Sequence, residues 1–351
     1  MLVPPVIDLS RCVFEVLRKD EAFIFYRAQS QDVASQVLVL SPAMQRPPAE
    51  SLKRLEHACS LRQELDPTRA TRPIAIARHW DRSVLVLEDP GGVPLDQLLD
   101  HPLDITFALR LAISLSSAIG ALHQGGLIHK DINPANVLVN SVTGRCWLTG
   151  FGIASRLPRE RQAPEPPEFV AGTLAYMAPE QTGRMNRSID SRSDLYSLGV
   201  TLYEVVTGSL PFTASDPMEW VHCHVARRPV SPSERLKTVP ATVSGIIMKL
   251  LAKIAEERYQ TAAGLESDLR RCLADRDAKR GVEQFPLGEH DTPDRLLIPE
   301  KLYGRDREIK TLLDAFDQVV TTGQPSLVLV SGYSGIGKST RCSFRPVAFL
   351  L

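Results

Sequence analysis

The chain has 351 residues, and 43% of them are hydrophobic, which is enough for two or three ordinary domains with buried cores. Lysine and arginine together number 41, as do aspartate and glutamate, so the zero net charge excludes a general electrostatic attraction to nucleic acid or to an anionic membrane. The six cysteines are scattered without a C-x-x-C pair, which favours a reduced, cytoplasmic protein over a disulfide framework. The N-terminus lacks the pattern of a signal peptide, and we expect no membrane span, because no apolar run approaches the roughly 20 residues that a bilayer requires.

The N-terminal part of the sequence predicts a small, β-rich lobe with one helix. Apolar residues at helical spacing predict a helix over residues 48–65. Runs rich in β-formers predict strands on both sides of it, over residues 22–26, 36–40, 74–77 and 83–87.

A long helix is predicted over residues 104–123. Asp104 is a suitable N-cap, apolar residues from Phe107 to Ile119 recur on one stripe, and Gly125 and Gly126 would end the helix. This helix leads directly into residues 127–140, LIHKDINPANVLVN, and a strand is predicted shortly after them, over residues 145–149.

The segment that follows the helix contains a candidate catalytic loop. His129, Lys130 and Asp131 are followed five residues later by Asn136 and then by an apolar run. A tight loop with this spacing can aim an aspartate at a substrate hydroxyl while the asparagine ligates a metal ion. An H-x-D-x4-N pattern also occurs by chance in polar loops, so its meaning depends on the flanking sequence.

Three further blocks follow in order: GTLAYMAPE at residues 172–180, SRSDLYSLG at 191–199 and EERYQTAAGLESDL at 256–269. Together with the loop they resemble the eukaryote-type serine/threonine protein kinases. The resemblance implies an α+β, two-lobed fold, with a small β-rich N-terminal lobe and a mostly helical C-terminal lobe. It also implies ATP and Mg²⁺ as cofactors, and a protein substrate or signalling partner.

The resemblance implies roles for particular side chains. Asp131 would act as catalytic base or orient the substrate hydroxyl, Asn136 would ligate Mg²⁺, and Thr173 would lie in the substrate-recognition segment. Asn133 stands where serine/threonine kinases usually carry a lysine, so an uncharged amide would face the transferred phosphate. Structural roles are implied for His129, for Asp194 as a cap of the loop backbone, and for Glu180 paired with Arg258.

Several kinase features are missing. The first glycine of the chain is Gly91, so no glycine-rich loop covers the phosphates. Leu40 stands at the position of the strand lysine, and without that lysine Glu56 is expected to be a surface carboxylate. Gly150 replaces the aspartate of the D-F-G motif, which would hold Mg²⁺. These changes predict weak phosphoryl transfer.

Trp220, His222, Cys223 and His224 lie close together in the sequence. A metal site is one interpretation of this cluster. A helix in the C-terminal lobe is favoured, because no second pair of ligands has a suitable spacing.

A second domain is predicted near the C-terminus. Residues 326–330 form an apolar run that leads into GYSGIGKS, a complete G-x-x-x-x-G-K-[ST] motif in the context expected for a P-loop. In such a loop the backbone cradles phosphates, the lysine reaches the β/γ oxygens and the serine holds Mg²⁺. The nucleotide-binding candidates are Gly332, Gly335, Gly337, Lys338 and Ser339. Residues 340–351 are too few to complete a P-loop NTPase domain of α/β type, so this domain is expected to be incomplete.

The whole arrangement resembles the N-terminal part of large bacterial multidomain proteins, which join a serine/threonine-kinase-like domain to an ATPase and to sensor and histidine kinase modules. That resemblance implies downstream ATPase and sensor modules, and we expect this chain to be a truncated, frameshifted or fragmentary member. The expected divisions are an N-lobe at 1–90, a C-lobe at 91–277, a linker at 278–300 and an incomplete P-loop domain at 301–351.

Three functional hypotheses follow. The first is a catalytically impaired, pseudokinase-like regulatory module that binds a partner or a nucleotide. The second is an active serine/threonine kinase with an atypical metal arrangement around Asp131 and Asn136. The third is a nucleotide switch centred on Lys338. A small-molecule kinase of similar fold is also conceivable, although the segment from Thr173 to Glu180 is typical of kinases that act on peptides.

Overall fold

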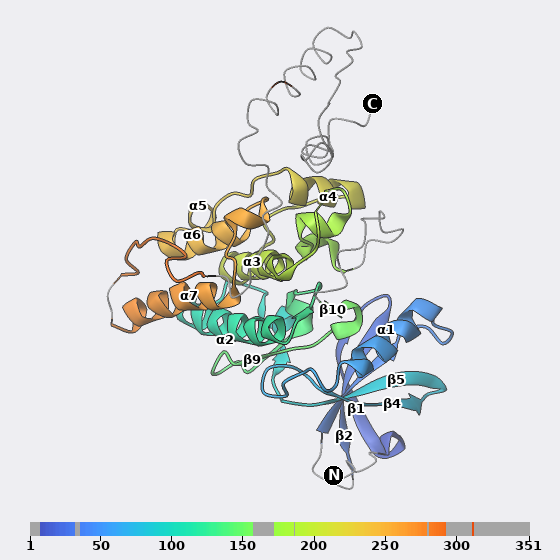
Figure 1. The fold of residues 1–351 in the computed structure, drawn as a ribbon. Coiled ribbons are helices and arrows are strands. Elements are labelled where there is room, and N and C mark those ends of the chain that lie inside the picture. The colour runs from blue at the N-terminus through green and yellow to red at the C-terminus, as the bar shows by residue number, and fades with distance from the viewer. Residues whose placement is uncertain are drawn as a thin grey trace.

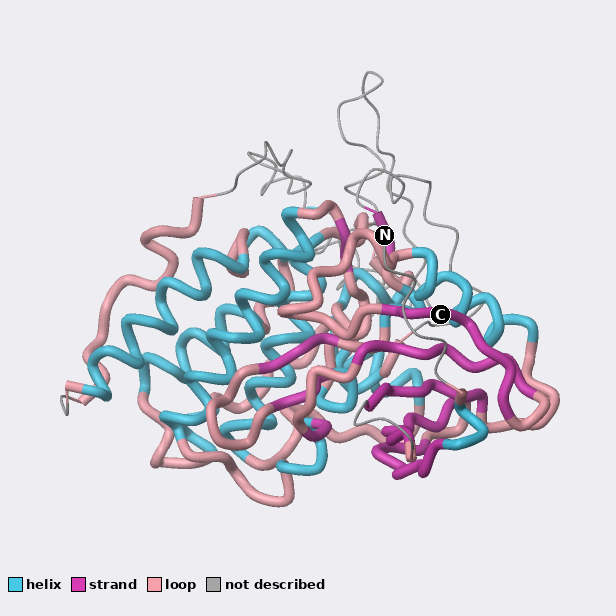
Figure 2. Tube along the Cα trace, turned by 90° about the horizontal axis from the view of Figure 1, so that it is seen from below, coloured by secondary structure: helices cyan, strands magenta, loops and turns pink. Residues whose placement is uncertain are grey.

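The computed structural model describes residues 8–31, 36–156, 172–185, 187–278, 281–292 and 311. These residues form two lobes (Figure 1), a small lobe built on a β-sheet and a larger lobe built mainly of helices. Seen from below, the long strands gather at one end of the molecule and most helices at the other (Figure 2). The α+β, two-lobed architecture expected from the sequence is therefore confirmed.

The N-terminal lobe contains a five-stranded antiparallel sheet in the order β1-β2-β3-β5-β4. A short 3₁₀-helix, η1 (Leu9–Arg11), precedes the sheet, and the helix α1 (Ala49–Ser60) connects β3 to β4. The strands are β1 (Cys12–Lys19), β2 (Phe23–Ser30), β3 (Gln36–Pro42), β4 (Pro73–His79) and β5 (Arg82–Glu88).

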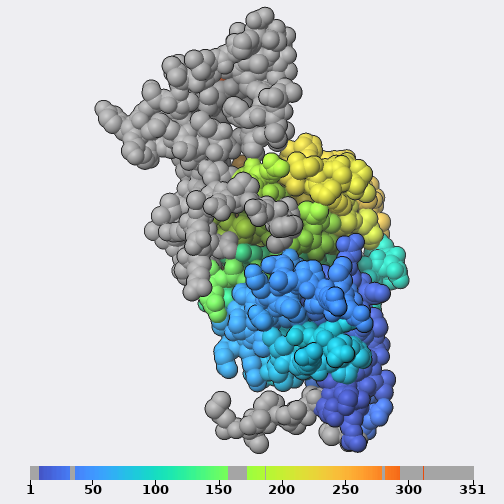
Figure 3. All heavy atoms as spheres, turned by 90° about the vertical axis from the view of Figure 1, so that its right-hand side faces the viewer, coloured from blue at the N-terminus to red at the C-terminus, as the bar shows by residue number. Residues whose placement is uncertain are grey.

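Alternation along β3 separates the two faces of this sheet. Val37 and Val39 point to one face, where they form a small core with Leu9 of η1. Leu38 points to the other face and belongs to the large core cluster, together with Leu55 of α1. One face of the sheet thus receives α1 and the C-terminal lobe. In the space-filling view of Figure 3 the N-terminal lobe, in blue and cyan, lies directly against the green and yellow C-terminal lobe.

The four strands predicted in this lobe are confirmed as β2 to β5, but β1 was not predicted. Most of its side chains are exposed or only half-buried, so the strand lacks a strong apolar signal. Its register with β2 also shifts between Val16 and Arg18, which breaks the period-two pattern that reveals a strand in a sequence.

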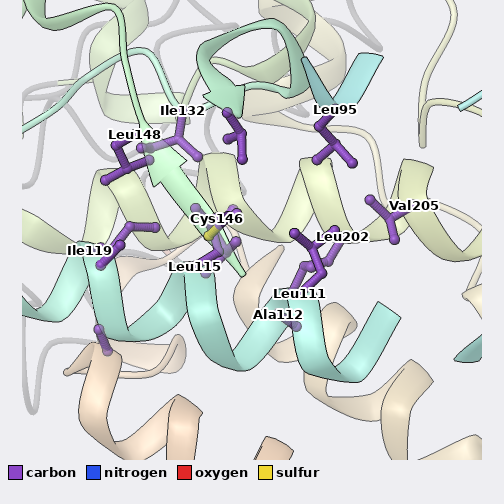
Figure 4. Packing of buried hydrophobic residues seen from close by; sticks show 14 of the residues in the cluster. Leu95, Leu111, Ala112, Leu115, Ile119, Ile132, Cys146, Leu148, Leu202 and Val205 are labelled. Atoms are coloured by element: carbon purple, nitrogen blue, oxygen red, sulfur yellow. The ribbon is translucent and has the colours of Figure 1, made fainter. Parts of the chain in front are cut away.

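The helix α2 (Ile105–Gln124) lies at the centre of the C-terminal lobe. Its residues Leu111, Leu115 and Ile119 pack beside Leu202 of α3 and Cys146 of β9 in one continuous core (Figure 4). The other elements of this lobe are the helices α3 (Ser191–Thr207), α4 (Pro217–Val225), α5 (Pro232–Arg235), α6 (Ala241–Leu250) and α7 (Ala262–Asp277), and the short strands β6 (Val93–Pro94), β7 (Leu127–Ile128), β8 (Val137–Val139), β9 (Cys146–Leu148) and β10 (Ser155–Arg156).

The predicted start of α2 is confirmed, because the Asp104 carboxylate accepts hydrogen bonds from the backbone N–H of Thr106 and Phe107. By length and composition α2 also passes the test for a membrane-spanning helix, which the sequence analysis did not recognise. Of its most apolar stretch, 61% is buried inside the lobe, as in the core helix of a globular domain.

Part of the segment expected to be a linker is docked on the C-terminal lobe. Asp291 accepts hydrogen bonds from the backbone N–H of Gln260 and Thr261, at 2.6 and 2.9 Å. Phe285 and Leu287 pack against the large core cluster. The lobe therefore includes residues as far as Asp291.

A buried ion pair connects two distant parts of the C-terminal lobe. The Arg258 guanidinium donates to both carboxylate oxygens of Glu180, at 2.7 and 2.9 Å, and the Arg258 side chain is fully buried. Burial alone would raise the pKa of Glu180, but the charge of Arg258 and its hydrogen bonds hold that pKa below its usual value. The pair expected from the sequence thus forms, and it ties η7 (Pro179–Thr182) to the segment before α7.

Removal of one partner of this pair should be costly, because it leaves the other charge buried and unpaired. We expect Arg258→Met to lower the free energy of unfolding by about 3–5 kcal/mol in a chemical denaturation experiment. Arg270 pairs with Glu266 on an exposed helix surface, so Arg270→Met serves as the matched control and should cost less than about 0.5 kcal/mol. Equal effects of the two substitutions would contradict the structural role of the buried pair.

The aromatic and histidine cluster considered as a metal site lies on α4, so the helical interpretation of this segment is confirmed. His224 is buried between Tyr196 and Phe212, and its Nδ1 lies 3.0 Å from the Tyr196 hydroxyl. Burial, reinforced by the nearby Lys253 ammonium, lowers the pKa of His224 to about 4. The side chain is therefore neutral in the folded protein at neutral pH.

This lowered pKa predicts acid sensitivity. His224 binds a proton below about pH 6.5 when unfolded but only near pH 4 when folded, so stability falls as the pH drops through that window. Between pH 7 and pH 5 the loss should be about 2 kcal/mol, and His224→Gln should remove it. His222 is exposed on the same helix, and the control His222→Gln should leave the loss unchanged. Denaturation curves at both pH values measure the difference.

Candidate functional site

A cavity of about 330 Å³ lies between the two lobes. Its apolar lining residues include Leu40 and Leu85 of the sheet and Leu55 of α1. Its charged and polar lining residues include Arg18, Asp20, Arg54, Asp131 and Asn136, and Gly150 also lines it. The site residues predicted in the loop at 129–136 therefore meet side chains of the N-terminal lobe that the sequence analysis did not consider.

Asp194, at the start of α3, holds the loop in place. Its fully buried carboxylate accepts hydrogen bonds from the backbone N–H of His129 and Lys130, both at 2.8 Å, and lies 2.9 Å from Nε2 of His123. Lys130 has a φ of 68°, a left-handed conformation that costs energy in a non-glycine residue. The two hydrogen bonds to Asp194 stabilise this turn and thereby aim Asp131 into the cavity.

The ring of His129 stabilises the loop through contacts with Thr149 and Phe151. It is fully buried, its Nε2 lies 2.9 Å from the carbonyl oxygen of Thr149, and it packs on Phe151 with 4.8 Å between ring centroids. This contact links the loop to the G-F-G segment that follows β9.

A backbone N–H and two side-chain amides donate hydrogen bonds to the Asp131 carboxylate. Its Oδ1 accepts hydrogen bonds from the backbone N–H of Thr173 at 2.9 Å and from Nδ2 of Asn133 at 3.1 Å. Its Oδ2 accepts from Nδ2 of Asn136 at 2.8 Å. These bonds fix the orientation of the carboxylate and bring Asp131, Asn133, Asn136 and Thr173 together at one place.

Both ends of the Asn136 amide have partners. Nδ2 donates to Asp131, and Oδ1 accepts from Nη1 of Arg18 at 3.1 Å. The oxygen that would ligate a metal ion is therefore hydrogen-bonded to a guanidinium. Arg18 also donates to the carbonyl oxygen of Ala135, at 2.7 Å, so it is attached to the loop at two points.

Position 150 has no room for a side chain that could serve as a second metal ligand. The residue has a φ of 84°, and a Cβ atom built on it would lie 2.5 Å from Cγ and Oδ1 of Asn136. The Asn136 side chain thus occupies the space that an aspartate at position 150 would need. An aspartate there would require Asn136 to move.

A bulge in β1 aims Arg18 at the loop. The register shifts between Val16 and Arg18, so the consecutive residues Leu17 and Arg18 both turn toward the interior. Asp20 closes the β1–β2 turn by accepting from the backbone N–H of Ala22 and Phe23, and it also pairs with Arg18 at 3.3 Å. An aspartate-based turn takes the place of a glycine-rich one.

The sequence analysis missed Arg18 and Arg54 as site residues. The only local signal for Arg18 was its place near the end of the run CVFEVLRK, two residues before Asp20 and the turn that this aspartate begins. Arg54 stands between apolar positions of α1 and looks like a solvent-facing residue. Glu56, two residues further along α1, is exposed, as expected.

The residues present do not fit the two-ligand Mg²⁺ site that the kinase resemblance implies. Gly150 supplies no ligand, and the Asn136 oxygen is hydrogen-bonded to a cation. Nowhere in the described ranges do three or more His, Cys, Asp or Glu side chains form a group that could hold a metal ion.

The connection between the lobes is held by an internal ion pair. Arg27 of β2 donates to Asp89 at 2.6 Å and to the carbonyl oxygen of Gly92 at 2.7 Å. The Asp89 side chain is almost fully buried. This pair fixes the start of the segment that leads from β5 to β6.

The predicted P-loop is not part of the structure described above. Gly332, Gly335, Gly337, Lys338 and Ser339 all lie outside the described residues.

Comparison with known proteins identifies the family. The protein kinase domain model matches residues 43–269, and an AAA ATPase domain model matches residues 301–343. Serine/threonine-protein kinase PknB of Mycobacterium tuberculosis is 37% identical over 187 residues, which cover 53% of this chain and 29% of that protein. A probable serine/threonine-protein kinase of Corynebacterium efficiens is 33% identical over 224 residues, or 62% of this chain and 33% of that protein.

A third relative has a different name. Hybrid signal transduction histidine kinase G of Dictyostelium discoideum is 27% identical over 324 residues, which cover 68% of this chain and 9% of that protein. The chain thus spans about a third or less of the length of these relatives. Since the kinase model matches well over half of its residues, the chain belongs to the protein kinase family.

Proposed function

We propose that the two-lobed domain is a signalling module of the serine/threonine kinase type that is impaired in phosphoryl transfer and acts by binding a partner. One observation carries this proposal: the Asn136 oxygen accepts a hydrogen bond from Arg18, while Gly150 offers no ligand. Phosphoryl transfer depends on metal ions and cations that neutralise developing charge, and both metal ligands are compromised here.

Energetics support an impaired site. Loss of one good electrostatic contact typically costs about 3 kcal/mol, or a hundredfold or more in rate. The glycine-rich loop, the strand lysine, the loop lysine and the metal aspartate are all replaced in this sequence. Even if these losses are far from additive, efficient turnover is not expected.

The alternative is an active kinase with an atypical metal arrangement. The observation in its favour is the hydrogen-bond network around Asp131, which joins Asn133 and the substrate-segment residue Thr173. In this alternative Asp131 would orient the substrate hydroxyl, and Asn133 would donate a hydrogen bond to the transferred phosphate.

A third candidate function concerns the C-terminal part. The match of an AAA ATPase model to residues 301–343 supports a nucleotide switch centred on Lys338 and Ser339. In that arrangement the kinase-type domain would regulate an ATPase module and, through it, further sensor modules in the cytoplasm. The likeness to a hybrid histidine kinase supports such a multidomain context.

A phosphotransfer assay tests the main proposal. With Mg²⁺-ATP and a general protein substrate, we expect the full chain to turn over at least a thousandfold more slowly than the roughly 1–100 s⁻¹ of ordinary kinases. Asp131→Asn should leave this residual signal nearly unchanged. Turnover near 1 s⁻¹ that is abolished by Asp131→Asn would instead support the active kinase.

An aspartate introduced at position 150 should not by itself restore phosphotransfer activity. Because any side chain at position 150 collides with Asn136, we expect Gly150→Asp to raise phosphotransfer by less than about tenfold and to lower the melting temperature. Gly150→Ala is the matched control, since it adds the Cβ without the carboxylate and should lower the melting temperature to a similar extent. A large gain of activity in Gly150→Asp alone would show that the rest of the site is competent.

A further inference from the structure

We propose that Arg18 takes the place of the divalent cation, so that the cavity binds a phosphate chain without metal, between Arg18 and Arg54. This inference rests on the impaired module proposed above and specifies what its cavity recognises. The ligand class is a polyphosphate anion, as found in a metal-free nucleoside triphosphate.

The position of Arg18 supports this assignment. Its Nη1 contacts the Asn136 oxygen and the Ala135 carbonyl oxygen, and its Nη2 lies 3.3 Å from Asp20. A fixed positive charge therefore stands beside the oxygen to which a metal ion would bind. The Nε of Arg18 is buried and has no hydrogen-bond partner among the described residues, although a buried N–H group is costly to leave unpaired.

Arg54 supplies a second guanidinium to the same cavity. Its Nε is also buried and has no hydrogen-bond partner in the described part of the chain, and Glu50 lies 3.8 Å away. The stem of Arg54 packs over Gly152, where a Cβ would approach it to 3.2 Å. The small residue in the G-F-G segment thus allows α1 to bring this arginine close to the loop.

The chemistry of the two arginines favours phosphate. Guanidinium groups bind phosphate oxygens through charge-assisted and often bidentate hydrogen bonds. Two such groups line one cavity, where Arg18 also pairs with Asp20 at 3.3 Å and Arg54 with Glu50 at 3.8 Å. A phosphate chain already complexed with Mg²⁺ carries less negative charge, and its metal would be repelled by Arg18. The cavity should therefore bind the phosphate chain most tightly in the absence of Mg²⁺, whereas an ordinary kinase site binds the nucleotide together with Mg²⁺.

The test is a titration of the full chain by calorimetry, in a Lys338→Ala background that disables the predicted P-loop. Inorganic tripolyphosphate and ATP are each added with EDTA or with excess Mg²⁺. We expect binding in EDTA that Mg²⁺ weakens by at least about fivefold. Arg18→Ala and Arg54→Gln should each weaken it by about tenfold or more, as expected for loss of a charge-assisted hydrogen bond.

Lys19→Ala is the matched control, because Lys19 is the neighbouring cation in β1 but is exposed and does not line the cavity. This substitution should change the affinity by less than about twofold. Arg18→Lys keeps the charge without the planar fork and should bind with intermediate affinity. Melting curves of each variant show whether it is folded.

Similar affinities for tripolyphosphate and ATP would show that the phosphate chain alone is recognised, whereas tighter binding of ATP would add a contribution from the nucleoside.

Three results would overturn the inference: no binding of either anion in EDTA, binding that requires Mg²⁺, or tighter binding in Arg18→Ala. The last result would mean that Arg18 blocks the cavity. None of these results decides whether the domain transfers phosphate, which the separate phosphotransfer assay measures, so the two proposals fail independently.

Discussion

The geometry of the site depends on one buried carboxylate. Asp194 accepts hydrogen bonds from the backbone of His129 and Lys130 and has no exposed surface. Burial would raise the pKa of Asp194, but the hydrogen bonds from His123 and from the backbone N–H of His129, with the electrostatic attraction of His123, hold it below its usual value. Through its two backbone hydrogen bonds the Asp194 carboxylate keeps Lys130 in a left-handed conformation. This turn determines the direction in which the Asp131 side chain points.

Around this support the protein has the two-lobed architecture of a kinase, but an arginine contacts the asparagine that would bind the metal ion. Gly150 offers no ligand, the Asn136 side chain occupies the space beside it, and Arg18 donates a hydrogen bond to the Asn136 amide oxygen. These three features depend on one another, because a side chain at position 150 would displace Asn136 and break its bond to Arg18. The loss of the metal aspartate is therefore matched by contacts elsewhere in the same site.

Much of the fold could be predicted from the sequence. The helix that begins after Asp104, the strands β2 to β5 and the pair of Glu180 with Arg258 follow from local patterns or from the order of the kinase-like blocks. The prediction failed for β1, whose pattern is broken by a bulge. It also failed to notice that α2 is apolar enough to pass a membrane-span test, since Arg110 and several small polar residues interrupt the apolar run.

The sequence alone determined the fold class, the loop that carries Asp131, and the absence of an aspartate at position 150, because these depend on residue identity and short-range spacing. Only the tertiary structure showed that Arg18 contacts Asn136, a residue 118 positions away. Such a contact depends on the bulge in β1, on the approach of the two lobes and on the space left by Gly150. No local pattern encodes these features, since they arise when distant segments pack together.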